Sequence, residues 1–145
     1  MTLADEIKSF FKGEVRDDEK TLDTYSRDAS LFEVRPKLVV FPKDADDIKA
    51  LVKFVAAKKC DTSSPENQKL SISVRAAGSC MSGGSLNESI IVDTTTHLNG
   101  ILALSEDEAT VLPGTFYRDF EVETLKIGSI LPCYTASKNL CALGG

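Results

Sequence analysis

Two short segments of the chain are apolar at every position. Residues 38–41 read Leu-Val-Val-Phe and residues 90–92 read Ile-Ile-Val. Unbroken apolar runs of this length are typical of strands that are covered on both faces, as in parallel sheets. Residues 70–74 form a third strand-like segment. We therefore predict a small parallel sheet, whose first strand ends at Pro42.

The segment after the first predicted strand has helical spacing. Its apolar stripe consists of Ile48, Leu51, Val52, Val55 and Ala56. Asp44 is a good N-cap, and Lys58 and Lys59 suit the negative end of the helix. A strand, this helix and the strand at 70–74 predict a right-handed βαβ unit. The polar residues 61–69 between them are expected on the surface.

The N-terminus predicts a short amphipathic helix. Leu3, Ile7, Phe10 and Phe11 recur at helical spacing, and Gly13 suits a helix stop. Residues 17–20 are polar and predict a connector. We therefore assign residues 1–21 to an N-terminal helix and connector, and residues 22–145 to the domain itself.

The hydrophobic pattern after residue 93 changes to that of a hairpin. Asn99-Gly100 predicts a turn, and residues 101–104 and 109–112 predict two arms joined by the acidic residues 105–108. This segment predicts the start of a second sheet.

A second amphipathic helix is predicted at residues 116–126. Thr115 is its expected cap and Gly128 its stop. Residues 129–131 predict a last short strand.

Composition limits the function classes. The 145 residues, 42% of them hydrophobic, suffice for one domain with a core. The formal charge of −5 argues against nucleic acid as a partner, because such binding needs a basic face. No stretch approaches the roughly 20 apolar residues of a membrane span. The first residues lack the pattern of a secretory signal. We expect a cytoplasmic protein that touches a membrane only through parts outside this sequence.

The metal-binding residue types are sparse. Cys60, Cys80, Cys133 and Cys141 form no Cys-x-x-Cys motif, and the chain has one histidine. No metal site is therefore predicted. The cysteines are expected to be reduced thiols that pack as small apolar groups.

The most informative segment is the loop at residues 75–85, between two predicted strands. Nine of its eleven residues are Gly, Ala, Ser or Cys. Such bare backbone adopts positive φ angles readily, and its amides can contact a phosphate group. Gly84-Ser85 replaces the Lys-Ser/Thr pair of a P-loop, and no Gly-x-Gly-x-x-Gly is present. A tight solvent loop is the alternative, although a hairpin turn needs only one glycine.

This loop resembles the pyrophosphate loop of flavoproteins of the vanillyl-alcohol oxidase/PCMH superfamily. It is most similar to the branch that contains D-lactate, glycolate and D-2-hydroxyglutarate dehydrogenases. Other segments resemble the same branch in the correct order, namely 25–30 (Tyr-Ser-Arg-Asp-Ala-Ser), 36–59, 91–94, 98–101, 111–114 (Val-Leu-Pro-Gly) and 141–145 (Cys-Ala-Leu-Gly-Gly).

The resemblance implies an α+β fold, a PCMH-type FAD-binding domain. It would consist of a small parallel βαβ subdomain and the start of a second, mixed or antiparallel sheet subdomain. The implied FAD-binding residues are Arg75, Ala76, Ala77, Gly78, Ser79, Cys80, Ser82, Gly83, Gly84, Ser85, Pro113, Gly114, Cys141, Gly144 and Gly145. From the residues alone, Arg75 can also be a surface ion-pair partner, and Pro113-Gly114 a simple strand-to-helix corner.

The resemblance also implies how the cofactor is held. Some members of the superfamily attach FAD through a histidine of this loop, and Ser79 occupies the matching position here. Non-covalent FAD is therefore expected. The single histidine, His97, is expected in a turn or on the surface.

The resemblance implies a flavin-dependent oxidoreductase that oxidises a small 2-hydroxy acid by hydride transfer to FAD. In the related dehydrogenases the base and the carboxylate-binding residues lie in a later domain. We therefore interpret the chain as truncated after Gly145 and expect no turnover from it alone. The catalytic residues, the electron acceptor and the substrate stay open. The alternatives are another FAD-linked oxidase or reductase of the superfamily, or a non-catalytic nucleotide-binding module.

Overall fold

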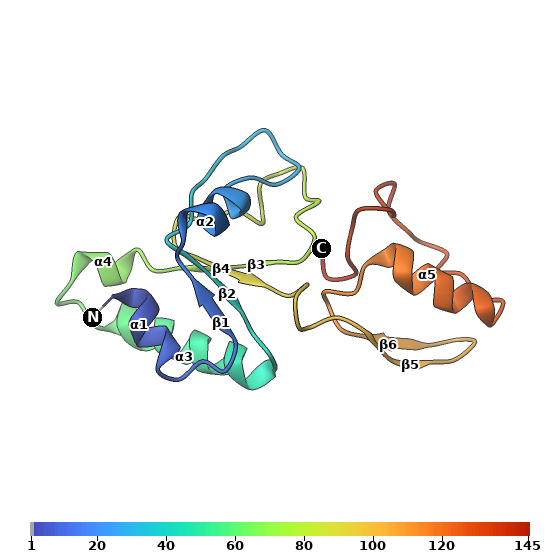
Figure 1. Cartoon of the computed structure of the whole chain (residues 1–145), viewed down its shortest axis with the longest axis horizontal. Helices are drawn as coiled ribbons and strands as arrows, with labels where there is room; N and C mark the ends of the chain where they lie inside the picture. Colours follow the sequence, from blue (N-terminus) through green and yellow to red (C-terminus); the bar gives the residue numbers. More distant parts are fainter. Residues whose placement is uncertain (1) are drawn as a thin grey trace.

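Two lobes of unequal size follow one another along the long axis of the molecule (Figure 1). The computed structural model describes residues 2–145. The larger lobe contains α1 (Leu3–Lys8), β1 (Glu14–Arg16), α2 (Glu19–Tyr25), β2 (Leu38–Phe41), α3 (Ala45–Cys60), α4 (Pro65–Gln68), β3 (Ile72–Arg75) and β4 (Ile90–Asp93). The smaller lobe contains β5 (Ile101–Leu104), β6 (Ala109–Val111) and α5 (Tyr117–Lys126).

The sheet of the larger lobe has the strand order β1-β2-β4-β3. β4 lies between β2 and β3 and is parallel to both, while β1 pairs antiparallel with β2. The unit β2-α3-β3 therefore crosses over one strand, and β4 later fills the gap. The register aligns Val40 with Val92 and Arg75 with Asp93, so these strands end at one edge.

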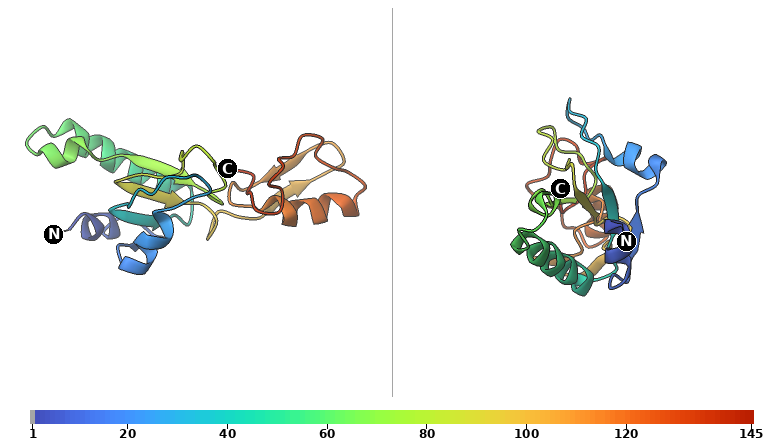
Figure 2. Two further views of the ribbon diagram at one scale, coloured as in Figure 1. Left: turned by 90° about the horizontal axis from the view of Figure 1, so that it is seen from above. Right: turned by 90° about the vertical axis from the view of Figure 1, so that its left-hand side faces the viewer.

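Both faces of this sheet are covered, as the unbroken apolar runs predict. Alternate residues of β2 and β4 (Leu38, Val40, Ile90 and Val92) pack with α1 and α3 in one core. The intervening residues Val39, Phe41 and Ile91 pack with Leu22 and Tyr25 of α2 in a second core. Figure 2 shows α3 and α2 on opposite sides of the sheet. All residues of β2 and β4 are buried in consequence.

The smaller lobe forms a third core between its hairpin and α5. Tyr117, Phe120 and Cys141 are buried there, with Ile101 and Val111 packed against them. β5 and β6 pair antiparallel, as predicted, with an irregularity near Ile101.

The N-terminal predictions need correction. α1 ends at Lys8 with Ser9 as its C-cap, so Gly13 does not stop it. Gly13 instead lies against β2, where a Cβ atom would be 2.0 Å from the carbonyl oxygen of Phe41. The predicted connector 17–20 contains the start of α2, capped by Asp18, whose carboxylate accepts the Thr21 amide at 3.0 Å. β1 was not predicted because a three-residue strand has too little pattern.

Two C-terminal predictions are also wrong. Thr115 does not cap α5, because its hydroxyl bonds Leu112 and Gly100 and so joins the two ends of the hairpin. Residues 129–131 pair with no strand among the described residues. Gly128 does follow the helix with a φ of 75°, as predicted.

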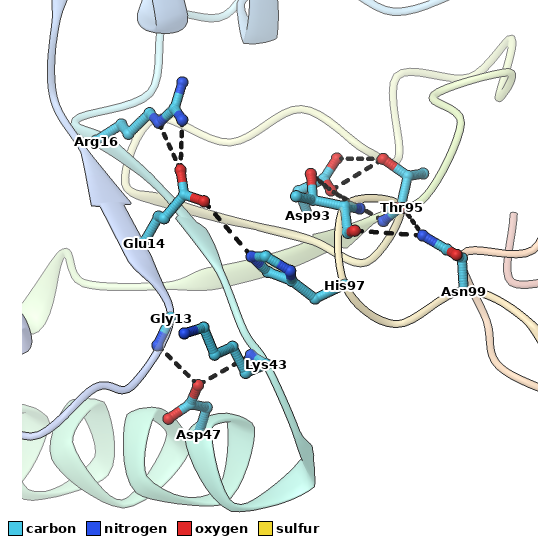
Figure 3. A network of polar contacts seen from close by, with 10 residues as sticks. Gly13, Glu14, Arg16, Lys43, Asp47, Asp93, Thr95, His97 and Asn99 are labelled. Atoms are coloured by element: carbon cyan, nitrogen blue, oxygen red, sulfur yellow. Dashed lines mark hydrogen bonds and ion pairs between the residues drawn. The ribbon is translucent and has the colours of Figure 1, made fainter.

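The buried carboxylate of Asp47 joins α3 to two other segments. It is 1% exposed and accepts the backbone amides of Gly13 and Lys43 at 3.0 and 2.9 Å (Figure 3). It also accepts the amide of Lys12 at 2.9 Å. Its own amide donates to the N-cap Asp44 at 3.0 Å. The start of α3 thus fixes the chain before β1 and the chain after β2.

Replacing Asp47 with Ala tests this role. The change leaves three amides without an acceptor, so we expect the free energy of unfolding to fall by about 3 kcal/mol in chemical denaturation. Asp46→Ala is the matched control, since its side chain is 77% exposed, and is expected to cost less than about 0.5 kcal/mol. Equal stability of the two variants would contradict the role of Asp47.

Candidate functional site

Three segments that the sequence singled out meet between the two lobes. The amide of Ala77, after β3, donates to the carbonyl of Gly145 at 3.0 Å. The amide of Gly144 donates to the carbonyl of Pro113 at 2.7 Å. The C-terminal residues therefore lie between the glycine-rich loop and the Pro113-Gly114 corner, where Figure 1 places the chain end.

Close backbone approach explains two of the glycines. A Cβ on Gly114 would lie 2.0 Å from the carbonyl oxygen of Thr94, and one on Gly144 would lie 2.7 Å from that of Pro113. Neither residue has a positive φ. These glycines are required by contacts within the protein, because Gly114 packs against the turn after β4 and Gly144 packs against Pro113.

The glycine-rich loop leaves its backbone amides free of protein oxygens. Gly78 and Gly83 have φ angles of 66° and 77°, which side chains rarely adopt. Within the described chain, none of the amides from residue 78 to residue 85 donates to a backbone or side-chain oxygen. A row of such amides can bind an anion.

Two loop side chains have other partners. The Arg75 guanidinium lies 4.9 Å from the Tyr25 ring centre and donates to the carbonyls of Arg27 at 2.8 Å and Tyr25 at 3.4 Å. The Ser85 hydroxyl is buried and donates to Asp28 at 2.8 Å. Within residues 2–145, Arg75 forms no ion pair, and both side chains contact the turn at residues 25–28.

Tyr25 and Asp93 connect α2 to the end of β4. The Tyr25 hydroxyl donates to Oδ2 of Asp93 at 2.9 Å, and burial followed by the Asp93 charge raises the pKa of that phenol. Oδ1 of Asp93 accepts the amide of Thr95 at 2.9 Å (Figure 3) and that of Thr96 at 3.0 Å. This buried carboxylate fixes the turn that leads into the smaller lobe.

The remaining polar groups of the loop lie near its tip. The Cys80 thiol and the Ser82 hydroxyl are 3.0 Å apart. This hydrogen bond, with the nearby amides of Ser82 and Gly84, lowers the pKa of Cys80. Ser79 is half-buried and Ser82 exposed.

The other cysteines are dispersed. Cys60 and Cys133 are exposed, which contradicts the expectation that they pack as apolar groups, whereas Cys141 is buried. The Cys141 thiol lies in the core of the smaller lobe near Thr135, so only its backbone adjoins the meeting point. In the described part of the chain, no three His, Cys, Asp or Glu side chains gather as a metal site requires.

His97 lies in the turn after β4, as expected, but is half-buried and faces β1. Its Nε2 atom is 3.5 Å from Oε1 of Glu14 (Figure 3). The Arg16 hydrogen bond, aided by His97, lowers the pKa of Glu14. The histidine thus belongs to the contact between β1 and this turn.

A groove of about 870 Å³ lies elsewhere, between β5 and α5, and no candidate residue lines it.

One residue near the loop was missed by the sequence analysis. Asp28 accepts the Ser30 amide at 2.8 Å as well as the Ser85 hydroxyl. Burial raises the pKa of Asp28, but the hydrogen bonds from Ser30 and Ser85 outweigh burial, so the pKa is lowered. The Asp-x-Ser pattern of residues 28–30 is the signal that could have revealed this turn.

Comparison with protein families identifies the fold and its cofactor. Residues 36–145 match a family described as an FAD binding domain. The chain belongs to this family of FAD-binding domains. The expected cofactor, FAD, is thereby confirmed for the family.

The curated relatives are D-2-hydroxyglutarate dehydrogenases. The protein of Pseudomonas putida is 30% identical over 103 residues, which cover 71% of this chain and 10% of the relative. That of Haemophilus influenzae is 30% identical over 101 residues, covering 70% of this chain and 9% of the relative. The chain thus spans about a tenth of the length of these relatives.

Solved structures support the same fold. Alkyldihydroxyacetonephosphate synthase matches with a TM-score of 0.73 at 21% identity, covering 97% of this chain and 28% of its own. 6-Hydroxy-D-nicotine oxidase from Arthrobacter nicotinovorans matches with a TM-score of 0.64 at 24% identity, covering 81% of this chain and 24% of its own. The expected PCMH-type α+β fold is confirmed. Within residues 2–145, no helix has the length and apolar character needed to cross a membrane.

Gly114→Ala tests the close contact that holds the corner. Its Cβ would overlap the Thr94 carbonyl, so we expect the free energy of unfolding to drop by about 3 kcal/mol. Gly84→Ala is the control, because its Cβ would meet nothing nearer than Cys80 Sγ at 3.5 Å. That variant is expected to change stability by less than about 1 kcal/mol. A Gly114→Ala protein as stable as the control would disprove the close packing.

Proposed function

We propose that the backbone amides of residues 78–85 bind the pyrophosphate of FAD. The observation that carries this proposal is the row of loop amides without a protein oxygen, next to two other segments that resemble flavin-binding turns. Hydrogen bonds to a charged acceptor contribute roughly 1.5–3 kcal/mol each. Three or four of them hold a dinucleotide without a cluster of basic side chains.

The hydroxyl groups of Ser79 and Ser82 supplement these amides. Arg75 and Ser85 act differently, because their polar atoms already bond Arg27 and Asp28. They shape the loop, and the phosphate contacts fall to the backbone. Pro113, Gly114, Gly144 and Gly145 form the adjoining wall of the proposed site.

The cofactor is held without a covalent bond. Ser79 stands where some superfamily members have the linking histidine, and a hydroxyl does not form that bond. His97 is turned toward Glu14. Bound FAD supplies the hydride acceptor, and the residues of this chain hold and orient it.

The whole protein is proposed to be a flavin-dependent oxidoreductase that acts on a 2-hydroxy acid. Support comes from the relatives named D-2-hydroxyglutarate dehydrogenase. Because the chain spans about a tenth of their length, the groups that bind the substrate and remove its proton are assigned to other parts of such a protein. The electron acceptor is left open.

Gly84→Val tests the pyrophosphate loop. Valine fits the backbone, since φ is not positive and the nearest atom to a new Cβ lies at 3.5 Å, but its bulk blocks a ligand from the amides. We expect the FAD dissociation constant of the purified gene product to rise at least about tenfold. Circular dichroism is expected to match the wild type.

Ala109→Val serves as the control, because this residue is exposed on β6 and remote in sequence from the loop. It is expected to bind FAD like the wild type. Unchanged FAD affinity in Gly84→Val would place the phosphate site elsewhere.

Reduction of the bound flavin tests the substrate class. Anaerobic addition of D-2-hydroxyglutarate, D-lactate or glycolate to the FAD-loaded gene product is expected to bleach the visible flavin band with one of the three. Bleaching only by an alcohol, amine or sugar would favour another branch of the superfamily. A protein that takes up no FAD would favour a non-catalytic module.

A further inference from the structure

The turn after α2 contacts the glycine-rich loop along its length. Besides the contacts of Arg75 with Tyr25 and Arg27 described above, this turn, residues 25–32, is tied to residues 78–85 of the loop by three contacts. The amide of Ala29 donates to the carbonyl of Gly78 at 3.0 Å, where the loop begins. Asp28 accepts the hydroxyl of Ser85 at 2.8 Å, where the loop ends. Two consecutive residues thus hold both ends of the loop.

The third contact lies between these ends. A Cβ on Gly83 would be 2.8 Å from Cδ2 of Phe32, so the aromatic ring rests against this glycine. The ring is 59% exposed and is not part of a core. Its contact with the loop adds to the two hydrogen bonds.

We propose that Asp28 is a positioning residue that fixes the curvature of the loop for the FAD pyrophosphate, an inference that rests on the proposed function above. Asp28 acts through Ser85 and does not contact the phosphate, because a carboxylate repels that dianion. Its second oxygen accepts the Ser30 amide, which closes the turn and aims the first oxygen at Ser85.

The composition of the loop explains why such an anchor is needed. A chain rich in glycine and serine has many conformations, and ordering each residue costs free energy on binding. A loop whose ends are already held loses less freedom when the ligand binds. Removal of the anchor is therefore expected to weaken ligand binding more than it weakens the fold.

The test is a double-mutant cycle on the Asp28–Ser85 bond in the purified gene product. Asp28→Ala and Ser85→Ala are each expected to raise the FAD dissociation constant about tenfold. The double variant is expected to bind FAD no more weakly than Asp28→Ala, because Ser85→Ala removes only a bond that Asp28→Ala has already removed. Melting temperatures without FAD are expected to stay within about 4 °C of the wild type.

Two further variants separate positioning from general damage. Asp28→Asn keeps an oxygen for the Ser30 amide and can donate to the Ser85 hydroxyl, so its FAD affinity is expected within about threefold of the wild type. Asp61→Ala is the matched control, because Asp61 accepts the Ser63 amide at 3.0 Å in a similar turn, which lies between α3 and α4. It is expected to leave FAD affinity unchanged.

The outcomes distinguish this inference from the proposed function. Wild-type protein that takes up no FAD would overturn both. The positioning role alone would be overturned if the wild type binds FAD tightly and neither Asp28→Ala nor Ser85→Ala weakens that binding. A rise of about a hundredfold in the FAD dissociation constant of the double variant would also overturn the positioning role, since the two residues would then act separately.

Discussion

The parallel pairing of β4 with both β2 and β3 is the constraint on which the rest of the structure depends. β4 is buried at every residue and aligns Asp93 with Arg75 at one edge of the sheet. Parallel strands end on the same side, so the loop after β3 and the turn after β4 leave the sheet together. The glycine-rich loop and the path to the smaller lobe are therefore neighbours from the start.

A small set of polar side chains turns this edge into a defined site. Arg75 stacks on Tyr25, Tyr25 bonds Asp93, and Asp93 fixes the turn that follows β4. None of these groups needs to contact a ligand. Their partners lie on three different segments, so they hold the loop amides and the Pro113-Gly114 corner in fixed relation. Side chains thus shape the site, and we propose that the loop backbone binds the FAD pyrophosphate.

The sequence predicted the sheet because β2 and residues 90–92 of β4 are unbroken apolar runs. It predicted α3 because Asp44 and the apolar residues around Leu51 mark its start and inner face. It also predicted the loop, since glycine and serine are dense there. It could not show that Asp47 accepts the distant amides of Lys12 and Gly13 or that Asp28 anchors Ser85, because these contacts join residues 34 or more positions apart. Whether a three-residue segment forms a strand depends on its tertiary partners, which a short apolar pattern does not reveal. The sequence therefore missed β1 and wrongly predicted a strand at residues 129–131.

Hydrogen–deuterium exchange of the purified gene product with and without FAD tests the central claim most directly. Because the amides of residues 78–85 have no protein oxygen to bond, we predict that they exchange fast without FAD and markedly more slowly with it. Amides near Gly144 are expected to slow as well. Protection by FAD that falls elsewhere and leaves residues 78–85 exchanging freely would contradict the claim that this backbone holds the pyrophosphate.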